Sequence, residues 1–247
     1  MKLTFLGSGG SAVSARRACP SLMMNDSIVF DFGPGALKNL RASSTSAEQI
    51  SRVFISHQHA DHISDLMPFL WAIQIDGRQK PLELCGPPGF KKIFCKLLEC
   101  TSTPDGFFKF PLTVSELDFG GSRGEISTCR TSHSIPTMAF RVDSRGRSFC
   151  YSADTTYCPA LLDLARNVDV LIHEATFLED QLKIAELTYH STARMAGRAA
   201  KEANAKQLVL FHIPPPNEHR EKEFQSEAIE GYGSEVVVGQ DLASIEF

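Results

Sequence analysis

Four side chains that can bind metal follow directly on an apolar run in the stretch Val53-Phe54-Ile55-Ser56-His57-Gln58-His59-Ala60-Asp61-His62. The apolar residues predict a buried strand, so the pattern H-x-H-x-D-H begins where that strand ends. Loops at strand ends often carry catalytic groups. A tight turn would aim His57 and His59 at one point, and Asp61 and His62 at a neighbouring point. This arrangement suits two metal ions, and imidazole with carboxylate suits zinc, with manganese or iron as alternatives.

The grouping of these residues is not typical of a solvated polar loop. The chain has 8 histidines among its 247 residues, and three of them fall within positions 57–62. We therefore interpret the motif as part of a metal site whose remaining ligands lie elsewhere in the chain.

The composition predicts a globular protein with a sizeable core. Hydrophobic residues make up 43% of the chain and charged residues 22%, which is ordinary globular usage. The length allows one large domain or two small ones, and we expect a single domain over residues 1–247. No apolar run reaches the roughly 18–20 residues that span a bilayer, and the N-terminus is typical of a first strand and not of a signal peptide. The sequence predicts a cytoplasmic protein without a membrane segment.

Net charge and cysteine content limit which kinds of ligand, structural site and cellular compartment we expect for this protein. The net charge of -4 argues against broad electrostatic binding to nucleic acid, which generally needs a basic face, although a local basic groove stays open. The 7 cysteines include no C-x-x-C pair, which argues against a structural zinc ribbon. Their odd number favours reduced thiols in a reducing compartment.

Short runs rich in Val, Ile and Phe predict strands, and apolar residues at helical spacing predict helices. Strands predominate in both halves of the chain, and a few helices are inserted in each without strict alternation. This order favours an α+β fold, a four-layer αββα sandwich of two facing mixed sheets with outer helices. The predicted strands are residues 3–6, 28–32, 53–55, 82–85, 125–131, 138–142, 148–151, 168–173, 208–211 and 236–238, and the predicted helices are residues 63–75, 89–100, 159–166, 192–203 and 221–229.

Three further side chains with donor atoms follow predicted strands. His133 comes after residues 125–131, Asp154 after residues 148–151, and His212 directly after residues 208–211. Strand ends on one edge of a sandwich can converge, and two zinc ions need more donors than the first motif supplies. We expect these residues to complete the metal site.

These motifs resemble the metallo-β-lactamase superfamily of hydrolases, which has H-x-H-x-D-H, a lone histidine, an aspartate and a final histidine in this order. Two segments resemble its ribonuclease Z-like branch: residues 169–177 (DVLIHEATF) contain H-E-A-T-F, and residues 189–193 (YHSTA) contain H-S-T. Asp31 and the following residues 32–35 (FGPG) resemble its early aspartate–glycine turn. The resemblance extends from the first predicted strand to the last.

The resemblance implies a site with two divalent metal ions. One ion would be bound by three histidines, the other by an aspartate and two histidines, and a second aspartate would bridge both. The implied ligands are His57, His59 and His133 for the first ion, Asp61, His62 and His212 for the second, and Asp154 as the bridge.

The resemblance also implies catalytic roles and a partner. Glu174 would orient His190, which would donate a proton to the leaving oxygen, and Asp61 would steer the attacking hydroxide. A homodimer is implied as well.

Two divalent cations, the carboxylates of Asp61 and Asp154 and one hydroxide leave a single net positive charge, which matches the single negative charge of a phosphodiester.

Two features depart from the ribonuclease Z enzymes that trim transfer RNA. Asp154 follows His133 by only 21 positions, which leaves no room for the long flexible arm usual there. The last histidine lies in Phe211-His212-Ile213-Pro214-Pro215-Pro216, which differs from the usual serine- and arginine-bearing tail. We therefore predict a phosphodiesterase that cleaves a small phosphodiester, a cyclic nucleotide or a short RNA.

Three alternatives stay open at this point. The protein could process transfer RNA 3′ ends together with a partner surface. It could hydrolyse thioesters, lactones or sulfate esters on the same fold. It could also be a metal-binding sensor module without activity, although Asp61, Glu174 and His190 favour an enzyme.

Overall fold

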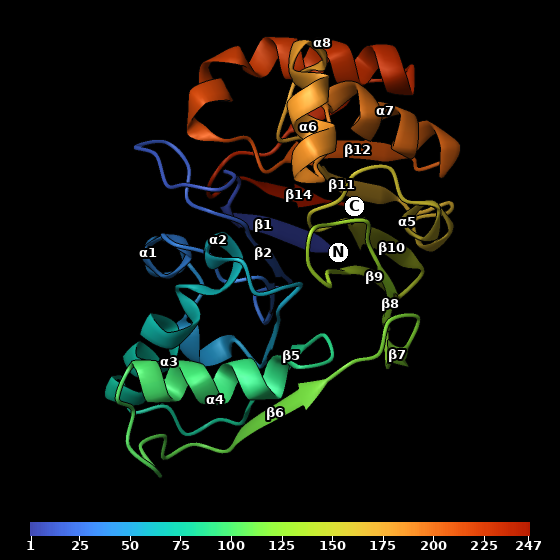
Figure 1. Ribbon diagram of the computed structural model, residues 1–247. Helices are drawn as coiled ribbons and strands as arrows, with labels where there is room; N and C mark the ends of the chain where they lie inside the picture. The colour runs from blue at the N-terminus through green and yellow to red at the C-terminus, as the bar shows by residue number, and fades with distance from the viewer. The chain divides into compact units, whose positions relative to one another are not determined.

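The computed structural model describes all residues, 1–247, and the chain divides into two compact units. The first, here called the N-terminal unit, consists of Lys2–Leu117 and Asp241–Glu246, and the second, the C-terminal unit, consists of Asp118–Gln240 with the end residues Met1 and Phe247. Each unit contains one seven-stranded sheet, and Figure 1 labels most of the strands. None of the helices has the length and apolar character needed to cross a membrane.

The sheet of the N-terminal unit has the order β14-β1-β2-β3-β4-β5-β6. Strands β3 to β6 run parallel, whereas β14, β1, β2 and β3 pair antiparallel. Strand β4 runs parallel to both of its neighbours, so the three strands end on the same side of the sheet. The H-x-H-x-D-H stretch begins at this carboxyl end of β4. The strands are β1 (Lys2–Gly7), β2 (Ser21–Met24), β3 (Ile28–Phe30), β4 (Arg52–Phe54), β5 (Leu82–Gly86), β6 (Leu112–Glu116) and β14 (Ser244–Glu246).

Helices cover one face of this sheet. Apolar side chains of alternate strand residues, such as Val53 and Leu84, pack with Leu40, Phe69 and Leu70 of the helices in one buried cluster. Burial of this apolar area is the main stabilising contribution, at about 25 cal/mol per Å². The helical segments are α1 (Ala36–Ala42), the 3-10 helix η1 (Ala47–Gln49), α2 (Ala60–Ile63), α3 (Leu66–Ile75) and α4 (Phe90–Cys100).

The sheet of the C-terminal unit has the order β13-β12-β11-β10-β9-β8-β7. Strands β10 to β13 run parallel, and β7 to β10 pair antiparallel. Two antiparallel pairings return β8 to the direction of β10, so both strands end at the same edge of the sheet. The strands are β7 (Ser122–Arg123), β8 (Ile126–Arg130), β9 (Met138–Ser144), β10 (Arg147–Tyr151), β11 (Val170–Glu174), β12 (Gln207–Phe211) and β13 (Val236–Val238).

Helices also cover one face of the second sheet. In Figure 1, α7 and α8 lie next to each other over β12, and their close approach depends on glycine. A Cβ atom on Gly197 would lie 2.2 Å from the carbonyl oxygen of Ala228. The helical segments are α5 (Pro159–Leu164), η2 (Glu179–Gln181), α6 (Leu182–Thr188), α7 (Ala193–Glu202), η3 (Pro215–Arg220) and α8 (Glu221–Tyr232).

All the predicted strands are present with shifts of one or two residues at their ends, but β2, β6, β7 and β14 were not predicted. The predicted helix over residues 63–75 is wrong in its first turn, because the chain forms the separate helices α2 and α3. Pro68 lacks an N–H group and is tolerated only in the first turn of α3. The side chain of the intervening Asp65 accepts hydrogen bonds from the backbone N–H groups of Gly35 and Leu37, and so caps α1.

Candidate metal centre

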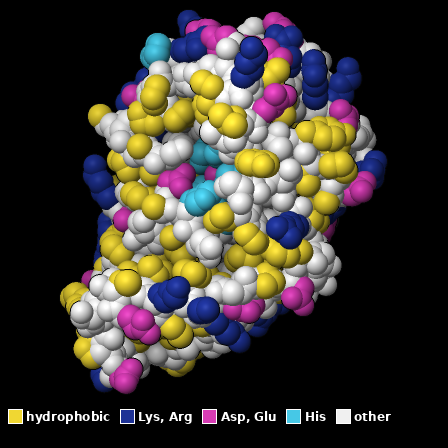
Figure 2. All heavy atoms as spheres, viewed as in Figure 1, with side chains coloured by type: hydrophobic (Ala, Val, Ile, Leu, Met, Phe, Trp, Pro, Cys, Tyr) yellow, Lys and Arg dark blue, Asp and Glu magenta, His cyan; other side chains and the backbone are white.

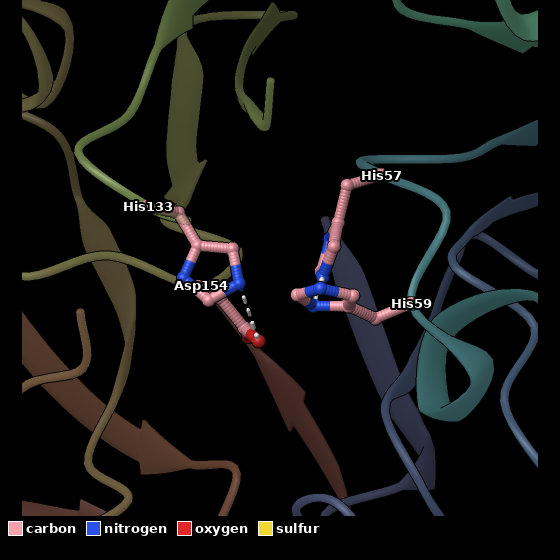
Figure 3. A group of neighbouring side chains, drawn as sticks. All are labelled: His57, His59, His133 and Asp154. Carbon is pink, nitrogen blue, oxygen red and sulfur yellow. Dashed lines mark hydrogen bonds and ion pairs between the residues drawn. The ribbon is translucent and has the colours of Figure 1, made fainter. Parts of the chain in front are cut away.

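The first histidine pair lies on the loop between β4 and α2 of the N-terminal unit. Nε2 of His57 is 3.1 Å from Nδ1 of His59, and Figure 3 shows the two rings meeting at these nitrogens. Two nitrogens bound to the same tetrahedral zinc at about 2.05 Å would lie roughly 3.3 Å apart. The spacing therefore fits a shared metal ion. The Oγ atom of Ser56 contacts the other ring nitrogen of His57 at 2.9 Å and orients the ring.

The second donor pair follows on the same loop. Nε2 of His62 lies 3.6 Å from Oδ2 of Asp61, again close to the separation of two ligands of one ion. Nδ1 of His62 donates to Oδ2 of Asp31 at 2.8 Å, and both side chains are fully buried. Because this hydrogen bond places the proton on Nδ1, Nε2 carries the lone pair that a metal ion requires.

Asp31 and Gly33 hold this loop from the turn that follows the neighbouring strand β3. The backbone N–H and the hydroxyl of Ser56 donate to the two carboxylate oxygens of Asp31 at 2.7 and 2.8 Å. A Cβ atom on Gly33 would lie 1.9 Å from the carbonyl oxygen of Asp61, so only glycine allows this approach. The aspartate–glycine turn is thus the support of the H-x-H-x-D-H loop.

The C-terminal unit carries three further donors at the same edge of its sheet. His133 follows β8, Asp154 follows β10, and His212 follows β12. The two oxygens of Asp154 face different histidines. Oδ2 lies 3.8 Å from Nε2 of His133, the pair joined in Figure 3, and Oδ1 lies 3.3 Å from Nε2 of His212. A carboxylate placed in this way can bridge two metal ions.

Other groups of the C-terminal unit fix the tautomers of these histidines. Nδ1 of His133 donates to the backbone carbonyl oxygen of Tyr189 at 3.1 Å, and Nδ1 of His212 contacts Oγ1 of Thr176 at 2.9 Å. In both rings Nε2 is left as the donor atom for a metal ion. Burial lowers the pKa of His133 more than Asp154 raises it, so the ring is neutral, as a ligand must be.

Glu174, which is fully buried, and His190, which is partly buried, form a pair next to this edge. Nδ1 of His190 donates to Oε1 of Glu174 at 2.8 Å, and Oε2 of Glu174 accepts from the hydroxyl of Thr176 at 2.8 Å. Burial alone would raise the pKa of Glu174, but the adjacent His190 outweighs it and the pKa lies below its ordinary value. The carboxylate therefore stays charged and holds the His190 ring in one orientation.

Three residues at or next to these donors adopt left-handed backbone conformations, which residues other than glycine rarely adopt. Asp31, Ala153 and His212 have φ values of 59°, 51° and 68°. Such conformations cost about 1–3 kcal/mol each and cluster at functional sites, where the surrounding structure compensates for them. Their placement beside the donor residues supports a functional role for these segments of the two units.

Sequence reasoning missed the supporting roles of Asp31 and Thr176 and of the Tyr189 carbonyl. Asp31 and Thr176 lie within motifs that the sequence analysis singled out, so their positions carried a signal. Their partners His62 and His212 are 31 and 36 residues away, and only the fold brings them together. A backbone carbonyl such as that of Tyr189 carries no sequence signal.

Comparison with known proteins shows where these features recur. A family model described as a β-lactamase superfamily domain matches residues 26–213. The ribonuclease Z of Myxococcus xanthus (strain DK1622) is 27% identical, with 100% of this chain and 97% of that protein covered.

Several solved structures match the whole chain, and two of them are 26% identical to it. The metallo-β-lactamase fold protein YhfI from Bacillus subtilis is 26% identical with a TM-score of 0.83, and covers 100% of this chain and 99% of its own. The short form of human tRNase Z gives the same identity, TM-score and coverage. These similarities confirm the predicted fold class, the metallo-β-lactamase sandwich.

Proposed function

The chain belongs to the β-lactamase superfamily, in its ribonuclease Z-like branch, and from this family membership we propose that it is a dinuclear metal-dependent phosphodiesterase. One observation carries the proposal: the two oxygens of Asp154 face two different histidines, His133 and His212. A single ion would need only one oxygen of this carboxylate. Two ions use both.

The two units would act as one hydrolase domain over residues 1–247. The family model spans residues 26–213 and so includes the donors of both units. The first ion would then be held by His57, His59, His133 and Asp154, and the second by Asp61, His62, His212 and Asp154.

The donor set of imidazoles and carboxylates fits zinc, and manganese or iron are compatible with it. When bound, two such ions supply positive charge to the phosphoryl oxygens and lower the pKa of water to about 7. Asp61 is partly exposed, and its carboxylate would accept a hydrogen bond from the attacking hydroxide and orient it.

His190 would act on the leaving group. Its Nδ1 donates to Glu174, so the imidazolium carries its second proton on Nε2, from which it can pass to the leaving oxygen. Glu174 is also held by the backbone N–H of Thr155 at 3.1 Å, which prevents the pair from rotating. Glu174 is therefore a positioning residue and His190 the general acid.

The substrate would be a small phosphodiester, a cyclic nucleotide or a short RNA. The alignment with the Myxococcus enzyme runs over 303 positions against the 247 residues of this chain, so the relative is longer within the matched region. Basic and acidic side chains are interspersed on the face shown in Figure 2, which displays no continuous basic stripe. Both observations support a substrate smaller than transfer RNA.

Two further assignments belong to the same proposal. All seven cysteines are unpaired, which supports action in the cytoplasm. A homodimer is proposed on the family resemblance.

The test is metal analysis and hydrolysis of bis-p-nitrophenyl phosphate by wild type, Asp154→Asn and the exposed control Asp118→Asn. We expect two ions per chain and chelator-sensitive cleavage in wild type and control. In Asp154→Asn we expect fewer than two ions and a rate at least about a hundredfold lower. Wild-type protein that holds two ions without cleaving the diester would refute the proposal.

A panel of 2′,3′-cyclic nucleotides, short RNA and precursor transfer RNA identifies the substrate. A clear preference for precursor transfer RNA would overturn the small substrate and support processing of transfer RNA ends.

A further inference from the structure

A cavity of about 320 Å³ lies within the C-terminal unit, between β11 and the helices α5, α6 and α7. Its lining includes Leu161 of α5, Leu182 of α6, Met195 and Ala199 of α7, and His173 of β11. Successive residues of a strand point to opposite faces of the sheet, so His173 and Glu174 lie on opposite sides of β11. The cavity is therefore separate from the face on which Glu174 holds His190.

His173 is the polar group in the wall of this cavity that the proposed catalysis does not use. The side chain is 2% exposed, and its Nδ1 donates to the backbone carbonyl oxygen of Glu174 at 2.8 Å. The proton is thus on Nδ1, and Nε2 is an acceptor with no hydrogen-bond partner in the chain. A ligand with an N–H donor that enters the cavity would supply this acceptor with a hydrogen bond.

The charges around the cavity have the matching sign. Glu186 and Glu202 form no ion pair, and Glu202 only accepts a hydrogen bond from the hydroxyl of Tyr157 at 3.3 Å. Glu179 lies 3.8 Å from Nε of Arg194 and is compensated. Arg198 is the one unpaired cation of the lining. Two unpaired carboxylates against one guanidinium favour a cationic ligand.

We propose that this cavity binds a small organic amine whose ammonium group donates to Nε2 of His173 and faces the carboxylates of Glu186 and Glu202. The apolar part of the amine would pack on Leu161, Leu182 and the other apolar side chains. The volume lies at the lower end of the roughly 300–1,000 Å³ found for ligand sites, which restricts the ligand to a small molecule.

The cavity shares two backbone contacts with the catalytic edge. His173 bonds the carbonyl of Glu174, and Ser191, which also lines the cavity, donates to the carbonyl oxygen of Thr155 at 2.7 Å. Ser191 follows His190 directly, and Thr155 donates its N–H to Glu174. A bound amine would thus alter the placement of the Glu174–His190 pair and change the rate of catalysis, a consequence that rests on the proposed function.

The binding test is calorimetric titration of the metal-loaded protein with phenethylamine and with 3-phenylpropionate, which has a similar apolar body and the opposite charge. We expect one amine per chain, bound at least about tenfold more tightly than the carboxylate. Equal affinity for the two compounds, or no binding of the amine, would overturn the proposal.

Variants assign the binding to the cavity. The double substitution Glu186→Gln and Glu202→Gln should weaken amine binding about tenfold, whereas Glu235→Gln, on the exposed surface of the same unit, should not change it. Ala199→Met should fill part of the cavity and abolish binding. Retained affinity in both cavity variants would place the amine elsewhere and refute the assignment.

Nitrogen NMR of the histidines gives a readout that needs no substitution. Hydrogen bonding to the amine should shift the Nε2 resonance of His173 and leave that of the exposed His219 unchanged; an unmoved His173 signal at saturation would overturn the proposed contact.

Rate measurements separate the two proposals. Phenethylamine should change kcat for a phosphodiester with a poor leaving group, which needs the proton of His190, in wild type but not in Ala199→Met. Amine binding in a protein without diesterase activity would refute the proposed function and leave the cavity assignment standing. An unchanged wild-type kcat at saturating amine would refute the link to catalysis.

Discussion

Asp31 and His62 are joined by a 2.8 Å hydrogen bond between Oδ2 and Nδ1, with both side chains fully buried. The same carboxylate accepts the backbone N–H and the hydroxyl of Ser56. Asp31 thus fixes the tautomer of the proposed ligand His62. It also anchors Ser56, where the loop with the other proposed ligands of this unit begins.

Asp31→Asn should weaken metal binding, because the amide accepts fewer hydrogen bonds and no longer enforces the Nδ1–H tautomer of His62. Loss of such a supporting group typically costs about 10–100-fold in metal affinity. Competition with a chromophoric chelator measures this change. Asp105→Asn, at an exposed position of the same unit, is the control, and an unchanged affinity in Asp31→Asn would show that the loop holds His62 without this carboxylate.

His190→Ala should lower kcat by about 10²–10⁴-fold for a diester with a poor leaving group, since general acid catalysis contributes that much. The loss should be much smaller for p-nitrophenolate, which departs without a proton. Metal content should stay at the wild-type value, and the exposed His219→Ala should behave like wild type. Equal losses for both leaving groups would contradict the role of His190 as a general acid.

The sequence predicted the strand ends that carry donor residues, but it missed three of the four outermost strands and one inner strand, β2. His57, His133, Asp154 and His212 were placed correctly at strand ends, because an apolar run followed by a polar donor marks the end of a buried strand. The strands that escaped prediction are β2, β6, β7 and β14. Strand β14 pairs with β1 across nearly the whole chain, as in the Leu3–Ile245 pair, and β7 has only two residues. Tertiary pairing decides such strands more than local propensity does.

The same limit applied to the candidate site. Side chains that can bind metal are recognised in a sequence by residue type and spacing, whereas a supporting group is recognised only by its contacts in the fold. Thr176 contacts Glu174, His190 and His212 at once, yet a threonine in an apolar segment is compatible with an ordinary strand end. The cavity beside His173 could not be predicted from the sequence either, because its walls come from four separate elements, α5, α6, α7 and β11, that only the fold brings together.

Asp169→Asn should reduce stability in a pH-dependent way. The ammonium of Lys206, at 2.8 Å, and then the backbone N–H of Ser148 hold the pKa of Asp169 below its ordinary value. A lowered folded-state pKa stabilises the protein above the unfolded value of about 3.9, and the contribution disappears as the pH falls through the folded-state pKa.

Urea unfolding at neutral pH and at pH values below about 4 checks this prediction. We expect Asp169→Asn to cost about 1 kcal/mol at neutral pH and progressively less in acid. Asp163→Asn, which removes an exposed pair with Arg166, is the matched control and should have little effect at either pH. A deficit that is independent of pH would mean that the charge of Asp169 does not stabilise the fold.

Gly197→Ala should destabilise the C-terminal unit through the contact between α7 and α8. The new Cβ atom would lie 2.2 Å from the carbonyl oxygen of Ala228 and 2.9 Å from the backbone nitrogen of Tyr232, and neither can move without the helix. Overpacking of this kind costs about 1–3 kcal/mol, which outweighs the gain in helix propensity of roughly 1 kcal/mol. Thermal unfolding of Gly197→Ala and of Ser226→Ala, an exposed position on α8, measures the effect. An unchanged or higher Tm for Gly197→Ala would show that the two helices can separate without loss.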